Sequence, residues 1–145
     1  MQVTNFLAID DSLATSGQPG PEQLRDMANL GFNTVVNLAL PTSDNALANE
    51  GAIVTGLGMN YVHIPVVWED PRAEQFDVFS AVMNSHKSGK IWVHCALNMR
   101  VSVFVYLYRR LHLNVPEPVA EQTLHEIWQP NSVWNDFIER IKSGA

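Results

Sequence analysis

A single cysteine and an arginine stand at the two ends of a short loop in the second half of the chain. The cysteine is Cys95, and Arg100 follows it after four intervening residues. Residues 91–94 predict a buried strand, and the largely apolar stretch 101–112 predicts a buried helix. A loop between a strand and a helix N-terminus gathers backbone N–H groups into one concavity, which favours an anion and lowers the pKa of a thiol. Cys95 is therefore a candidate nucleophile.

The guanidinium of Arg100 suits the same chemistry. Its planar fork can hold two oxygens of a phosphate-like group and balance charge that develops in a transition state. The plainer alternative is that Cys95 is a small core residue and Arg100 an exposed helix residue. Their placement around one strand-to-helix turn favours the functional interpretation. With one cysteine in the chain, an intrachain disulfide and a multi-cysteine metal site are excluded.

Strands and helices alternate along the sequence. We expect strands at residues 6–9, 34–38, 61–64 and 91–94, with a turn at 10–12 and a loop at 15–20. We expect helices at about 21–31, 43–54, 76–89, 101–112, 116–128 and 132–142, the last of them capped by Ser132. This order predicts an α/β fold with a mostly parallel sheet, whose ligands bind at the carboxyl ends of its strands. Asn37 and Cys95 lie at two such ends.

Length and charge narrow the classes of function. The 145 residues fit one domain, 1–145, which can bury a core without disulfides or a metal. A net charge of −6 argues against nucleic acid as a partner. The five histidines show no metal-ligand spacing, so no metal is expected. No run is apolar enough for a membrane span, so we expect no membrane partner and a soluble protein, cytoplasmic, or periplasmic if a signal peptide was removed.

The run Val93-His94-Cys95-Ala96-Leu97-Asn98-Met99-Arg100-Val101-Ser102 resembles the signature of protein tyrosine and dual-specificity phosphatases. More closely, the chain resembles a bacterial branch of tyrosine-phosphatase-like proteins, because three further runs follow the pattern of that branch in order: Ser16-Gly17-Gln18-Pro19, Val35-Val36-Asn37-Leu38 and His63-Ile64-Pro65-Val66. The resemblance covers about residues 5–112. It implies a three-layer sandwich of the dual-specificity-phosphatase type and a hydrolase that acts, without a cofactor, on a phosphorylated protein or a small phosphoester.

The resemblance also implies roles for single residues. Cys95 would attack phosphorus, while Arg100 and the loop would bind the phosphoryl oxygens, the loop residues being Ala96, Leu97, Asn98 and Met99. His94 would hold the loop through hydrogen bonds to backbone groups. Family members protonate the leaving group from an aspartate on an upstream loop, which here is Asp70, with Glu69 as the alternate; otherwise both are solvated loop carboxylates. Ser102 would donate to the thiolate or bond back to a helix carbonyl.

The loop length leaves other functions open. The phosphatases have five residues between the cysteine and the arginine, whereas this chain has four, the length seen in rhodanese-like sulfurtransferases that carry a persulfide on the cysteine. Within this glycine-free loop, Asn98 is best able to take a left-handed conformation. A sulfurtransferase, and a module that binds phosphate or a phosphoprotein without efficient catalysis, are therefore the alternatives to a phosphatase.

Overall fold

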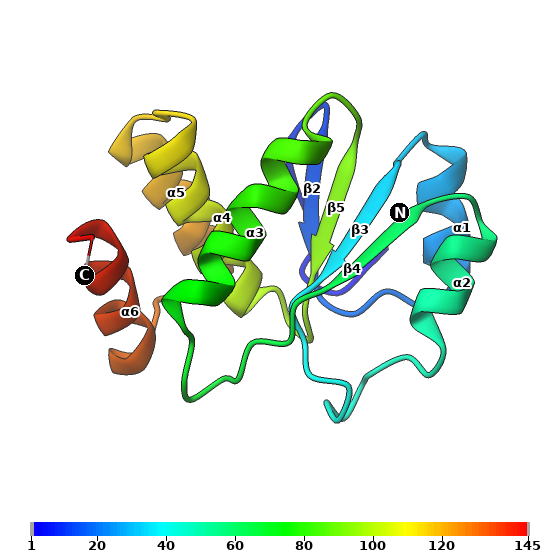
Figure 1. Ribbon diagram of the computed structural model, residues 1–145, viewed down its shortest axis with the longest axis horizontal. Coiled ribbons are helices and arrows are strands. Elements are labelled where there is room, and N and C mark those ends of the chain that lie inside the picture. Colours follow the sequence, from blue (N-terminus) through cyan, green and yellow to red (C-terminus); the bar gives the residue numbers. More distant parts are fainter. Residues whose placement is uncertain (1, 145) are drawn as a thin grey trace.

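A five-stranded sheet lies between two layers of helices in the computed structural model, which describes residues 2–144. Figure 1 shows α1 and α2 on one face of the sheet and α3 to α6 on the other. The strands are β1 (Leu7–Asp10), β2 (Leu13–Ser16), β3 (Thr34–Asn37), β4 (Asn60–His63) and β5 (Ile91–His94). The helices are α1 (Pro21–Asn29), α2 (Glu50–Gly56), α3 (Ala73–His86), α4 (Met99–His112), α5 (Glu117–Ile127) and α6 (Ser132–Lys142). The predicted three-layer α/β architecture is confirmed.

The strand order is β1-β2-β5-β3-β4. The pairs β2 with β5, β5 with β3 and β3 with β4 are parallel, and only β1 with β2 is antiparallel. In this register His94 at the end of β5 lies beside Ser16 on β2 and Asn37 on β3. Three parallel strands therefore end together, at the point where the chain leaves the centre of the sheet at Cys95.

The strand β2 corrects the prediction of a loop at residues 15–20. All four residues of β2 are buried, and two of them, Thr15 and Ser16, are polar. Burial is tolerated because their hydroxyls have partners: Thr15 Oγ1 donates to the Leu7 carbonyl over 3.4 Å, and Ser16 Oγ donates to the Gly17 carbonyl over 2.7 Å. With Thr15 as its one β-branched residue, this strand had no run of β-branched side chains, so its end resembled the loop that follows it.

Alternate residues of the central strands point to opposite helix layers. Trp92 of β5 packs with Val35 against α1 and α2, whereas Val93 packs with Val36 against the other layer. The helix α4 is the centre of that second layer, because every residue from Arg100 to Tyr108 is buried. The loop between β5 and α4 is thus anchored at both ends in the core.

Several helix termini differ from the prediction: α3 begins and ends three residues earlier, and α4 begins two residues earlier. Two further differences have a local cause. Residues 43–49 are not helical, and α2 begins only at Glu50, because Asn49 has a left-handed backbone with φ 62°. The cap of α6 is Asn131 rather than Ser132, since Asn131 Oδ1 accepts the Trp134 N–H over 3.0 Å. Among residues 2–144, the helices are too short or too polar to cross a membrane.

Candidate active site

Cys95 lies directly after the central strand β5 and is 1% exposed. It lines a cavity of about 200 Å³ together with Ala96, Leu97, Met99, Arg100 and Trp68. Cys95 and four of these residues belong to the predicted loop, and Trp68 comes from the connection between β4 and α3. The structure therefore brings Cys95, most of the loop and Arg100 to one cavity at the carboxyl edge of the sheet.

Asn98 takes the left-handed conformation that the sequence predicted for it, with φ 68°. Its side chain does not line the cavity of Cys95. Instead its Nδ2 donates to the Asn5 carbonyl over 2.8 Å and to Thr15 Oγ1 over 3.1 Å. The Asn98 side chain thus supports the loop from behind.

The carbonyl groups of the loop are held from outside. The Ala96 carbonyl accepts from the Gln18 N–H and from Asn45 Nδ2, both over 3.1 Å, and the Leu97 carbonyl accepts from Asn5 Nδ2 over 2.9 Å. In a trans peptide the N–H points away from the preceding carbonyl, so the Leu97 N–H is turned away from Gln18 and Asn45. The first backbone bond inside α4 runs from the Ser102 N–H to the Asn98 carbonyl. The three N–H groups at 99–101 therefore have no partner within the helix, and two of them belong to Met99 and Arg100, which line the cavity with Cys95.

Arg100 is 7% exposed and sits in the first turn of α4. Its Nη1 donates to the Val66 carbonyl, just after β4, over 2.9 Å. A guanidinium has five N–H donors, so this bond fixes the side chain and leaves further donors for an oxyanion.

Ser102 lies outside the lining of this cavity. Its hydroxyl donates to the Met99 carbonyl over 2.6 Å and accepts from Trp128 Nε1 over 2.9 Å. A hydroxyl has one proton to donate, so Ser102 in this structure bonds back to its own helix and does not donate to the Cys95 thiolate.

Asp70 is exposed on the connection between β4 and α3 and forms an ion pair with Arg72 over 2.8 Å. The residue of this connection that enters the cavity is Trp68, whose ring packs 5.2 Å from that of Trp128 and 5.9 Å from that of Trp134. Neither Asp70 nor the alternate acid, Glu69, is part of the cavity lining. Among the described residues, 2–144, the lining of this cavity thus contains no carboxylate.

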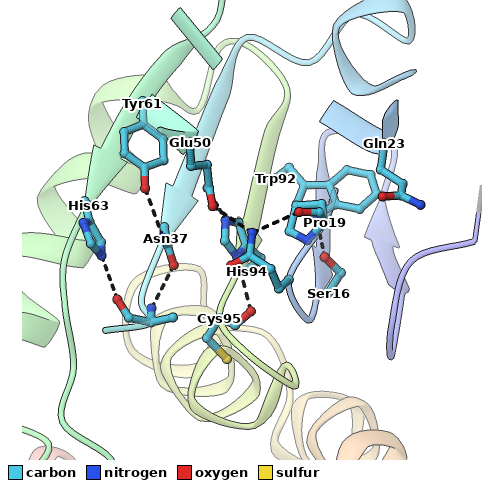
Figure 2. A network of polar contacts seen from close by, with 12 residues as sticks. Ser16, Pro19, Gln23, Asn37, Glu50, Tyr61, His63, Trp92, His94 and Cys95 are labelled. Carbon is cyan, nitrogen blue, oxygen red and sulfur yellow. Dashed lines mark hydrogen bonds and ion pairs between the residues drawn. The ribbon is translucent and has the colours of Figure 1, made fainter. Parts of the chain in front are cut away.

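A buried contact between a histidine and a carboxyl group beside Cys95 escaped the sequence analysis. His94 is completely buried, and its Nε2 lies 2.6 Å from Glu50 Oε2 (Figure 2). The other ring nitrogen, Nδ1, lies 3.3 Å from the Cys95 carbonyl. Gln18 Nε2 donates to the second oxygen of Glu50 over 2.7 Å. Gln18 belonged to a recognised motif, but no periodicity or spacing marked Glu50 as a buried carboxylate.

Glu50 also lines a second and larger cavity of about 460 Å³. Here Asn37 Nδ2 donates to the Tyr61 hydroxyl over 3.0 Å, and the Ala39 N–H donates to Asn37 Oδ1 over 2.8 Å. The pKa of Tyr61 is raised by burial and by the charge of Glu50, against a lowering effect of the Asn37 bond. Within the described residues, 2–144, no group of three or more His, Cys, Asp and Glu side chains could hold a metal ion.

Comparison with known proteins gives a family. The model of the family described as "DSP-PTPase phosphatase fused to NAD+ Kinase" matches residues 8–132. No curated protein matches the sequence. A solved structure from Shewanella putrefaciens CN-32, described as a candidate phosphatase (DUF442), is 29% identical with a TM-score of 0.87, over 98% of this chain and 91% of that one.

Two more distant structures share the fold. TpbA of P. aeruginosa, solved as a cysteine-to-serine variant in complex with pTyr, is 16% identical with a TM-score of 0.67, over 97% of this chain and 82% of that one. The kinase associated phosphatase KAP, with a substitution of its catalytic-site cysteine, is 12% identical with a TM-score of 0.77, over 91% of this chain and 86% of that one.

Proposed function

The chain belongs to the DSP-PTPase family of phosphatases, and from this premise we propose that it hydrolyses phosphoesters through a phosphocysteine intermediate on Cys95. The observation that carries the proposal is the cavity in which Cys95 and Arg100 meet at the N-terminus of α4. A thiolate, a bidentate cation and free backbone N–H groups around one cavity are the groups that transfer of a phosphoryl group requires.

In the proposed first step the Cys95 thiolate attacks phosphorus, an S–P bond forms, and the bond from phosphorus to the leaving oxygen breaks. Arg100 and the N–H groups of the loop and the first turn of α4 bind the three other phosphoryl oxygens. In the second step water attacks the phosphocysteine, the S–P bond breaks, and inorganic phosphate leaves with the thiolate restored. No cofactor takes part in either step.

The leaving oxygen needs a proton in the first step, and we propose that Asp70 supplies it after its loop moves. The ion pair that holds Asp70 outward is exposed on both sides. Such pairs contribute about 1 kcal/mol or less, so breaking it would oppose the movement only weakly. Trp68, packed against two other tryptophans, would remain the fixed point of the loop.

For the substrate we propose an aryl phosphate such as phosphotyrosine. Trp68, Leu97 and Met99 give the cavity apolar walls that suit an aromatic ring. The complex of TpbA with pTyr supports the same class.

The four-residue spacing between Cys95 and Arg100 favours one second candidate, a sulfurtransferase with a persulfide on Cys95. The two activities are tested together, by assaying the purified protein with p-nitrophenyl phosphate and, separately, with thiosulfate plus cyanide. We expect phosphate release and no thiocyanate, and we expect Cys95→Ser to abolish the release. Thiocyanate formation without phosphate release would reverse the assignment. Binding of inorganic phosphate with neither activity would make the chain a binding module.

A further inference from the structure

Glu50 and His94 are two ionisable side chains buried beside the nucleophile that the mechanism above does not use. His94 is 0% exposed and Glu50 is 5% exposed. They come from β5 and from the first turn of α2, which are 44 residues apart in the sequence. A carboxylate buried at this depth is costly unless it is paired and hydrogen-bonded, and here both of its oxygens have partners.

The contacts fix the number of protons that the pair carries. Nδ1 of His94 faces the Cys95 carbonyl, which can only accept, so a hydrogen bond there needs a proton on Nδ1. The 2.6 Å contact between Nε2 and Glu50 Oε2 needs a second proton, because two lone pairs would repel each other at that distance. Glu50 Oε1 also accepts from Gln18 Nε2. We place this second proton on Nε2 rather than on Glu50, because an imidazole is ordinarily more basic than a carboxyl group. Glu50 is then ionised with a donor on each oxygen, and His94 carries both protons.

We propose that Glu50 is a positioning residue that keeps His94 doubly protonated, so that the imidazolium holds the Cys95 carbonyl and presents a positive charge to the thiolate. The proposal rests on the proposed function, in which Cys95 must be ionised to attack. In this proposal the buried charge on His94 stabilises the thiolate from inside the core, whereas Arg100 and the N-terminus of α4 stabilise it at the cavity.

Other charged and titratable groups face this pair. Tyr61 and His63 on β4 line the same cavity as Glu50, and Arg100 on α4 lies with Cys95 in the smaller cavity. Burial first, and then the charge of Glu50, raise the pKa of Tyr61, so Tyr61 keeps its proton around neutral pH. Of these flanking groups, His63 alone has an ordinary pKa between 5 and 8, so His63→Gln belongs in the experiment.

The test compares Glu50→Gln with Glu121→Gln, which removes the same charge from an exposed pair in which Glu121 lies 3.9 Å from His125. The first measurement is the rate of Cys95 alkylation by iodoacetamide against pH. The His94 ring contacts the backbone carbonyl of Cys95 itself. A close opposite charge shifts a pKa by about 1–3 units, so the loss of that charge in Glu50→Gln should raise the inflection by about one unit or more. Below the inflection, alkylation should then slow about tenfold. Glu121→Gln and His63→Gln should leave the curve in place.

The second measurement is the ¹⁵N spectrum of the histidine rings in the unmodified protein. The signals of His94, assigned by their loss in His94→Asn, should show both ring nitrogens protonated at pH 7. His94→Asn retains an N–H donor for the Cys95 carbonyl without the charge, so its alkylation curve should shift in the same direction as that of Glu50→Gln.

A neutral His94 ring at pH 7 would overturn the proposal, even if Glu50→Gln failed to fold. An alkylation curve for folded Glu50→Gln that overlies the unmodified curve would overturn it as well. Neither measurement involves turnover. A protein with the shifted curve but no activity on p-nitrophenyl phosphate would therefore contradict the proposed function and not the role of Glu50.

Discussion

Asn98 allows the conformation of the loop between Cys95 and Arg100 to be tested by two substitutions at one position. Its backbone is left-handed, and its Nδ2 makes two buried hydrogen bonds. Asn98→Ala loses both bonds, worth about 1 kcal/mol each, and leaves a residue with a Cβ in a conformation that costs it about 1–2 kcal/mol. The change also removes Asn98 Oδ1, a buried acceptor without a partner within residues 2–144, which returns about 1 kcal/mol.

The expected net loss for Asn98→Ala is therefore about 2–3 kcal/mol. Asn98→Gly loses the same bonds but avoids the left-handed strain, at an entropic cost of about 0.5–1 kcal/mol. We expect the glycine variant to be the more stable of the two by about 1 kcal/mol. The difference isolates the backbone, because both variants lack the side chain.

The assay is urea unfolding followed by tryptophan fluorescence, since Trp92 and Trp134 are both buried. The same samples are titrated with inorganic vanadate to measure binding of an oxyanion at Cys95. Equal stabilities for the alanine and glycine variants would refute the argument from strain. A loss below about 0.5 kcal/mol in both would refute the argument that the side chain holds the loop.

Three further predictions test separate parts of the site and the core. Asp70→Asn should slow hydrolysis of a poor leaving group by about 10²-fold and that of a good one far less, and equal effects on both in steady-state assays would remove Asp70 as the acid. Arg100→Lys should lower vanadate affinity and turnover together, because lysine cannot bind two oxygens bidentately while keeping the bond to Val66; unchanged affinity in a vanadate titration would contradict this. The third prediction concerns Glu117. Burial raises the pKa of its carboxyl group, but hydrogen bonds from Tyr106 and Lys142 and nearby positive charge outweigh burial and lower this pKa below its usual value. The folded protein therefore gains stability from ionised Glu117 above the ordinary carboxyl pKa and loses it as the pH falls through the lowered value. In Glu117→Gln, the melting temperature should accordingly fall less between about pH 5 and pH 3 than it does in the unmodified protein.

The sequence predicted the central elements of the fold because their patterns were strong. Residues 91–94 and 101–108 are all buried, as their apolar composition predicted. The last turn of the predicted buried stretch, residues 109–112, is not, and Leu111 is exposed. The strand β2 was missed because Thr15 and Ser16 are buried through hydrogen bonds that a linear pattern does not reveal. The start of α2 was misplaced because a single left-handed residue, Asn49, delays it.

The sequence predicted the part of the candidate site that is formed by residues close together in the chain. Cys95 and Arg100 are close in sequence, so one strand-to-helix turn brings both to the same cavity. Asp70 was assigned through the family resemblance, and its exposed ion pair with Arg72 depends on a loop conformation that no sequence pattern specifies. Glu50 was missed for a different reason. A buried carboxylate differs from an exposed one only through its partners, and those partners lie on other elements.

The short loop owes its shape to distant segments rather than to its own residues. Its carbonyls accept from Asn5, Gln18 and Asn45, and the Asn98 side chain donates back to the segments that hold Asn5 and Thr15. These anchors come from the N-terminal residues, from β2 and the turn that follows it, and from the connection before α2. A loop of four residues has few conformations of its own, and each anchor removes more of them, so the donors near Cys95 are ordered before an anion arrives. Preorganised donors of this kind stabilise charge without the cost of reorganisation, so the number of residues between Cys95 and Arg100 does not by itself decide which anion the loop can bind.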